Sequence, residues 1–107
     1  RAATIVAMAS SDAAPSDFFR PGHVFPLRSA PGGVLERRGH TEACVDLCRL
    51  AGCTMPVGYI AEMCNDDGTM SRLPELTAFC DEHGLLLLTI EALAAHRQLG
   101  SAAAASS

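Results

Sequence analysis

Three clusters of turn-forming residues divide this chain into short segments, and they limit its possible folds more than any other feature. Residues 20–23 read Arg-Pro-Gly-His, residues 31–33 read Pro-Gly-Gly and residues 65–68 read Asn-Asp-Asp-Gly. Such combinations interrupt helices and strands. A chain of 107 residues buries only about 65% of its unfolded surface on folding. We therefore expect one domain with a single modest core, built from short elements.

Four segments have the composition or apolar spacing of helices. Gly52 and Gly84 are placed as C-terminal caps, and Pro74 suits the first turn of a helix. The helices expected are residues 2–9, 41–51, 74–83 and 91–99.

Other apolar segments are expected to be extended. Pro26 restricts residues 24–28 to an edge strand or a strand-like loop. Residues 57–64 read as a buried strand that carries Glu62, and residues 85–90 read as a core strand. A short extended piece is expected to begin at residues 34–35 and to end at residues 37–39. The alternation of helices and strands predicts an α+β fold.

Composition bounds the partners and the redox state. The net charge of −4, without a basic run, argues against nucleic acid. The longest apolar run, residues 85–88, is far too short to span a membrane, and no signal-peptide pattern is visible. The five cysteines form no CxxC pair, so we expect reduced, mostly buried thiols. Residues 101–107 are expected to be a disordered Ala/Ser tail.

Residues 37–42 (Arg-Arg-Gly-His-Thr-Glu) are the strongest local signal for a binding site. They place two guanidinium groups, an imidazole and a hydroxyl group at the start of an expected helix. Free backbone N–H groups and the helix dipole favour an anion such as phosphate there, and arginine adds charge-assisted hydrogen bonds. The alternative is that Thr41 only caps the helix and that the arginines are solvated.

His23, His40 and Glu62 are candidates for chemistry. Both histidines follow a glycine in a loop, and imidazole binds divalent cations and titrates near neutral pH. A carboxylate within an apolar segment is costly to bury unless a cation, a metal or hydrogen bonds support it. The alternatives are ordinary surface histidines and the exposed side of a half-buried strand.

Two further groups of residues could bind a metal, but each also has a simpler explanation. His40, Cys44 and Cys48 recur at intervals of four residues and would share a helix face. A structural Cys/His metal domain is therefore an alternative, although buried cysteines also serve as small core residues. For Asp66 and Asp67 a turn is a sufficient explanation.

Several motifs, taken in order, resemble the 3,4-dihydroxy-2-butanone 4-phosphate synthase family of the riboflavin pathway. The likeness runs from Arg1 to about Arg97, and separate motifs in register make it specific. The motifs are Arg-Pro-Gly-His at residues 20–23, Phe-Pro-Leu-Arg at 25–28, Gly-Gly-Val-Leu at 32–35, Arg-Arg-Gly-His-Thr-Glu-Ala at 37–43 and Asn-Asp-Asp-Gly-Thr-Met at 65–70.

The resemblance implies a lyase that uses Mg²⁺ (or Mn²⁺) to convert D-ribulose 5-phosphate to 3,4-dihydroxy-2-butanone 4-phosphate and formate. By motif, His40 is the metal ligand, and His23 and Glu62 are the catalytic groups that transfer protons. The substrate-binding residues implied are Arg37, Arg38, Gly39, His40, Thr41 and Glu62.

The resemblance also implies a three-layer domain with a mixed, twisted sheet flanked by helices, of which residues 1–100 would form the C-terminal half. The other half, with an acidic loop that supplies the second protein ligand to magnesium, is expected to be missing. The chain is thus expected to be a truncated, poorly active form of an enzyme that is a homodimer at full length. Its expected location is the cytoplasm, or the plastid in a plant or alga. The alternative is a non-catalytic module for sugar-phosphate binding or dimerisation.

Overall fold

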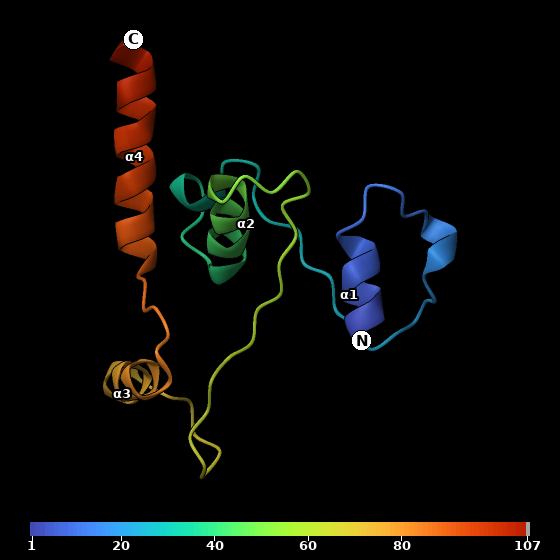
Figure 1. Cartoon of the computed structure of the whole chain (residues 1–107), viewed down its shortest axis with the longest axis horizontal. Coiled ribbons are helices and arrows are strands. Elements are labelled where there is room, and N and C mark those ends of the chain that lie inside the picture. The colour runs from blue at the N-terminus through green and yellow to red at the C-terminus, as the bar shows by residue number, and fades with distance from the viewer. Residues whose placement is uncertain (107) are drawn as a thin grey trace.

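The computed structural model describes the backbone of residues 1–106 and the side chains of residues 1–100, and this part of the chain is helical (Figure 1). Its elements, in order, are α1 Ala2–Met8, η1 Pro15–Asp17, η2 Gly33–Leu35, α2 His40–Leu50, α3 Leu73–His83 and α4 Ile90–Ser106, where η denotes a 3-10 turn.

The four predicted helices are confirmed. Their ends could be predicted because the residues that start and stop a helix act within a few positions of it. Pro74 lies in the first turn of α3, and Gly84 ends this helix with a φ of 64°, in the left-handed region that favours glycine. The backbone of α4 continues to Ser106, through most of the Ala/Ser segment for which the composition predicted disorder. Ser107 lies outside the described residues.

A small core forms where η2 lies between α2 and α4. Val34 of η2 is fully buried, and it packs with Leu93 and Ala94 of α4. Ala43 of α2 and Ile90 of α4 extend this cluster at its edge. We call η2, α2 and the first turns of α4, residues 90–97, the packed cluster. It brings together distant parts of the chain: Arg97 and Asp46, which are hydrogen-bonded, are 51 residues apart in the sequence.

The predicted α+β fold with a three-layer arrangement and a twisted sheet is wrong for the chain described here. Residues 1–106 contain no sheet, and their one β-bridge joins Cys64 to Met70 in antiparallel fashion. The segments expected as strands, residues 24–28, 57–64 and 85–90, have no neighbouring strand. An extended backbone is stabilised as a strand only when its N–H and C=O groups pair with another strand. The extended piece expected at residues 34–35 is instead part of η2.

The apolar side chains of these segments are largely exposed. Phe25 is 89% exposed and Leu86 is 99% exposed. We call residues 24–28, 56–63 and 85–89 the open segments. The radius of gyration is 16.5 Å, whereas a compact chain of this length has about 13 Å. Figure 1 shows the same openness, with α1 and α3 set apart from α2 and joined to it by irregular chain.

The Asn-Asp-Asp-Gly turn is confirmed at the Cys64–Met70 bridge. The N–H of Gly68 donates to the carbonyl oxygen of Asn65 at 2.9 Å. Asp67 accepts hydrogen bonds from the hydroxyl and the backbone N–H of Thr69, and these bonds hold the pKa of Asp67 below its usual range. Local turn geometry therefore accounts for these acidic residues.

Candidate functional site

The loop before α2 is held to this helix by Glu42, whose side chain is almost fully buried. Its Oε2 accepts a hydrogen bond from the backbone N–H of Ala30 at 2.9 Å, and its Oε1 accepts one from Nη1 of Arg37 at 2.6 Å. A buried carboxylate is costly unless hydrogen bonds replace its water. Here both oxygens are satisfied, and Glu42 anchors residues at both ends of the loop.

Asp46, one turn further along α2, is a second buried carboxylate. Its Oδ2 accepts hydrogen bonds from the backbone N–H of Val34 at 2.9 Å and from Nη1 of Arg97 at 3.1 Å. The same Nη1 also donates to the carbonyl oxygen of Gly32 at 2.7 Å. Asp46 and Arg97 therefore tie η2, α2 and α4 together. Among the side chains described, no buried nitrogen or oxygen lacks a hydrogen-bond partner.

The hydrogen bonds to Glu42 favour its ionised form. The N–H of Ala30, and after it the guanidinium of Arg37, hold the pKa of the Glu42 carboxyl below its usual range, although burial acts in the opposite direction. Glu42 is thus a permanent anion at neutral pH, and it keeps one nitrogen of Arg37 engaged.

Two glycines allow the close contacts of this loop. Gly33 has a φ of +64°, and a Cβ atom there would collide with the carboxylate of Asp46. At Gly39, a Cβ atom would collide with Nη1 of Arg37 and with Oε1 of Glu42. The guanidinium of Arg37 therefore lies directly against Gly39, where a side chain would have to displace the Arg37–Glu42 pair. At Gly33 the positive φ and the collision with buried Asp46 together require glycine.

Gly39 is also the N-cap of α2, and it provides no side-chain cap. Thr41 lies within the first turn of α2, so the structure does not place it as the cap. The first N–H groups of a helix have no partner within the helix, and in the described part of the chain those of His40 and Thr41 donate to no other group. These donors favour an anion.

Basic and polar residues are adjacent in sequence to these free N–H groups. Arg37, Arg38 and His40 are exposed, and Thr41 is half-buried. Arg37 keeps 66% of its side chain exposed while it contacts Glu42. The sequence-predicted residues 37–41 thus lie together at the start of α2, where a guanidinium, helix N–H groups and a hydroxyl group can bind a phosphate.

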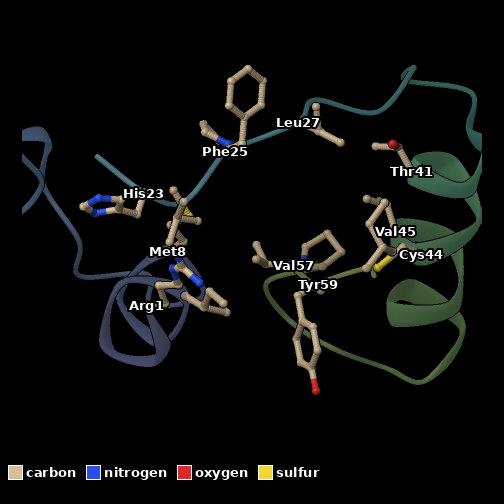
Figure 2. Close-up of a pocket in the computed structure, with 16 residues that line it drawn as sticks. Arg1, Met8, His23, Phe25, Leu27, Thr41, Cys44, Val45, Val57 and Tyr59 are labelled. Atoms are coloured by element: carbon tan, nitrogen blue, oxygen red, sulfur yellow. The ribbon is translucent and has the colours of Figure 1, made fainter. Parts of the chain in front are cut away.

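The two predicted catalytic residues are not brought to this point. His23 and Thr41 line the same open cleft, of about 470 Å³, which also contacts α1 and residues 56–60. Figure 2 shows His23 on the α1 side of this cleft, with its imidazole directed away from Thr41 on α2. Glu62 is exposed on an open segment and does not line the cleft. The described chain therefore places His23 in the same cleft as Thr41 but directs its imidazole away, and it leaves Glu62 outside this cleft.

The described residues do not form a complete metal site. They contain no group of three or more His, Cys, Asp or Glu side chains that could hold an ion. His40 is exposed, and the nearby carboxylate of Glu42 is already occupied by Ala30 and Arg37. His40, Cys44 and Cys48, the residues of the alternative Cys/His metal domain, form no such group in this part of the chain.

The cysteines are free, but the prediction that most are buried is wrong. Cys80 is buried, Cys44 and Cys48 are half-buried, and Cys53 and Cys64 are exposed. Burial raises the pKa of the Cys48 thiol, and the neighbouring thiols of Cys44 and Cys53 raise it further. A raised pKa keeps this thiol protonated and unreactive at neutral pH.

Comparison with known proteins identifies the family. Residues 1–96 match the sequence profile of 3,4-dihydroxy-2-butanone 4-phosphate synthase, and the chain belongs to this family. The family predicted from the motifs is thus confirmed. Among the described residues, every helix is too short or too polar to cross a membrane.

Individual relatives agree with this assignment. The chain is similar to a 3,4-dihydroxy-2-butanone 4-phosphate synthase of Desulfatibacillum aliphaticivorans, with 57% identity over 98 residues, covering 92% of this chain and 46% of the relative. It is 59% identical over 97 residues to the riboflavin biosynthesis protein RibBA of Aquifex aeolicus, covering 91% of this chain and 24% of that protein.

A solved structure is also similar. A 3,4-dihydroxy-2-butanone 4-phosphate synthase in complex with two magnesium ions superposes with a TM-score of 0.73 at 47% identity, covering 86% of this chain and 47% of that chain. The chain therefore spans about half the length of the first of these relatives and less of the second. Its assignment to the C-terminal half stays a prediction.

Sequence reasoning missed the residues that hold the site in place, Glu42, Asp46 and Arg97. The spacing of four residues between Glu42 and Asp46 puts both carboxylates on one face of α2, and this face also carries apolar residues. That combination was the available signal for buried carboxylates. Nothing in the local sequence indicated Arg97, because its partners are distant along the chain.

Proposed function

We propose that this chain is part of a magnesium-dependent 3,4-dihydroxy-2-butanone 4-phosphate synthase, which converts D-ribulose 5-phosphate to 3,4-dihydroxy-2-butanone 4-phosphate and formate in riboflavin biosynthesis. Family membership supports this reaction. The observation that carries the proposal is the arrangement at the start of α2, where Arg37 lies against Gly39 beside free helix N–H groups. A sugar phosphate has the dianionic group that such an arrangement binds.

In this proposal Arg37, Arg38 and the residues from Gly39 to Thr41 bind the phosphate end of the substrate. His23 and Glu62 transfer protons at its carbon atoms, and Glu62 also contacts the substrate. Both groups are exposed in the described chain, which leaves them free to exchange protons. They can act on one substrate only after the remainder of the enzyme brings them towards α2.

Magnesium is proposed because a similar family member is described as a complex with two magnesium ions. His40 is the ligand that this chain would contribute. Mg²⁺ demands near-octahedral coordination, mostly by oxygen, and the described residues offer no such set. Further ligands must therefore come from outside this part of the chain. Use of Mn²⁺, the homodimer and a cytoplasmic or plastid location stay predictions.

Formate release tests the proposed reaction. The 107-residue chain, incubated with ribulose 5-phosphate and Mg²⁺, should release formate weakly or not at all, because His23, Glu62 and the metal ligands are not assembled. A full-length member of the family, assayed in parallel, is the positive control. Turnover by the short chain at a rate close to that of the full-length enzyme would contradict the proposal that it is poorly active alone.

A second candidate is a non-catalytic sugar-phosphate-binding module. The finding that favours it is that Glu62 lies outside the cleft that Thr41 lines, while the imidazole of His23 is directed away from Thr41 within it. Ribulose 5-phosphate would then bind to the chain without formate release. Binding that is lost in both Arg37→Ala and His40→Ala variants would support this module, and unchanged binding in both would exclude it.

A further inference from the structure

We propose that Glu42 is a positioning residue for phosphate binding, which holds Nη1 of Arg37 against Gly39 at the start of α2 and leaves the other N–H groups of the guanidinium for the phosphate. The inference rests on the proposed function, because it takes the first turn of α2 as the place where the phosphate binds. Glu42 itself does not touch the substrate in this view. It acts through Arg37.

The contact between the two side chains has the asymmetry that positioning requires. The carboxylate of Glu42 is buried, with 2% of its side chain exposed, whereas Arg37 is 66% exposed. The pair uses Nη1 of Arg37 at 2.6 Å. Because a guanidinium carries five N–H donors in a rigid plane, fixing one nitrogen sets the direction of the others while leaving them available.

The same carboxylate also sets the position of the loop. Its second oxygen accepts the N–H of Ala30 at 2.9 Å, so Glu42 can rotate little. Gly39, the N-cap of α2, lies directly beside this ion pair, because a Cβ atom there would collide with both Nη1 of Arg37 and Oε1 of Glu42. The fixed carboxylate thus holds Nη1 of Arg37 at the start of α2.

Positioning and simple charge attraction predict opposite results when the charge of Glu42 is removed. By Coulomb attraction alone, loss of a carboxylate beside an anion site should tighten phosphate binding. If Glu42 positions Arg37, loss of the charge should weaken it, because the freed arginine must then be ordered by the ligand at an entropic cost. The sign of the change therefore decides between the two.

The experiment is a titration of ribulose 5-phosphate, and separately of inorganic phosphate, into the 107-residue chain, followed by amide chemical shifts. Glu42→Gln keeps an oxygen for the N–H of Ala30 and should weaken binding about tenfold, the loss of one charge-assisted contact. Glu36→Gln is the matched control. This variant removes an equal charge from the residue that precedes Arg37, whose carboxylate accepts a hydrogen bond from the N–H of Gly32 and does not bond to Arg37. It should leave phosphate binding equal or slightly tighter.

A double-mutant cycle separates positioning from general loss of structure. Arg37→Ala alone and Arg37→Ala with Glu42→Gln should bind equally weakly, because Glu42 acts only through Arg37. If the two effects multiply, or if Glu42→Gln binds as tightly as the wild type, the positioning role is wrong while the proposed function stands. If the wild-type chain binds neither probe, the proposed binding site itself fails.

Arg37→Lys tests the inference even if Glu42→Gln does not fold. Arg37 is mostly exposed, so this variant should fold normally, as checked by far-UV circular dichroism. An ammonium group cannot hold Glu42 and present a planar fork at the same time. Binding should therefore weaken nearly as much as in Arg37→Ala. Binding equal to that of the wild type would overturn the role of a fixed guanidinium.

Discussion

The packed cluster and the open segments differ in how their side chains are satisfied. In the packed cluster, Glu42, Asp46 and Arg97 pair with backbone groups and with one another, and Val34 is fully buried. In the open segments, Phe25 and Leu86 meet solvent. The first region contains its own partners. The second contains apolar side chains that remain exposed in the described chain.

This difference shows which parts of the family's structure a chain of half its length can support. Hydrogen bonds from backbone N–H groups to the buried carboxylates are formed within the chain, and they hold η2 and the loop beside it to α2. Exposed apolar segments depend on surfaces supplied from elsewhere. Of the residues proposed to bind phosphate, His40 and Thr41 belong to the packed cluster and Arg37 is bonded to it through Glu42. Glu62, by contrast, lies on an open segment.

The largest expected effect is at Gly33, which allows the closest approach within the packed cluster. Gly33→Val should destabilise the fold by about 4 kcal/mol, because valine is strained at a positive φ and would displace Asp46. Gly52→Ala is the control, since Gly52 also has a positive φ but its Cβ position is open. It should cost about 1 kcal/mol. Urea unfolding followed by circular dichroism measures both, and equal costs would show that the contact with Asp46 is unimportant.

Leucine truncation compares the two regions directly. Leu93 is 4% exposed and Leu86 is 99% exposed. Leu93→Ala should lower the free energy of unfolding by about 3 kcal/mol through the cavity it leaves. Leu86→Ala should change it by less than about 0.5 kcal/mol. Thermal unfolding of both variants at one protein concentration checks this, and a large loss for Leu86→Ala would mean that this open segment is packed in solution.

The smallest expected effect is the pH dependence that Glu42 contributes. Its pKa is lower in the folded chain than in the unfolded chain, so its stabilising contribution is complete above the ordinary carboxyl pKa of about 4.3. The contribution is lost as pH falls from there towards the folded pKa. Between pH 7 and acidic pH, the melting temperature of the wild type should fall more than that of Glu42→Gln. Parallel curves would show that Glu42 does not contribute.

Helices and turns could be predicted because their signals are local. Pro74 and Gly84 mark the two ends of α3 within a few residues of the elements they limit. The Asn-Asp-Asp-Gly turn is closed by its own side chains. The position of residues 37–41 at the start of a helix could be predicted for the same reason, because consecutive residues at a helix N-terminus lie together in space.

The sheet and the buried charges could not be predicted, because both depend on distant partners. Residues 85–88 have the apolar run of a core strand, but the run does not reveal whether another strand lies beside it. The composition of α2 shows Glu42 and Asp46 as ordinary helix carboxylates. Their burial results from Ala30, Val34 and Arg97, and the last of these lies far along the chain.

The hydrogen bond from Arg97 to the carbonyl oxygen of Gly32 spans 65 residues of sequence. The entropy lost on closing such a loop grows only with the logarithm of its length, at about 0.6 kcal/mol for each doubling. Insertions or deletions in the chain between α2 and α4 therefore change the cost of docking α4 very little. This part of the molecule can accept new loops during evolution while the attachment of α4 to η2 stays intact.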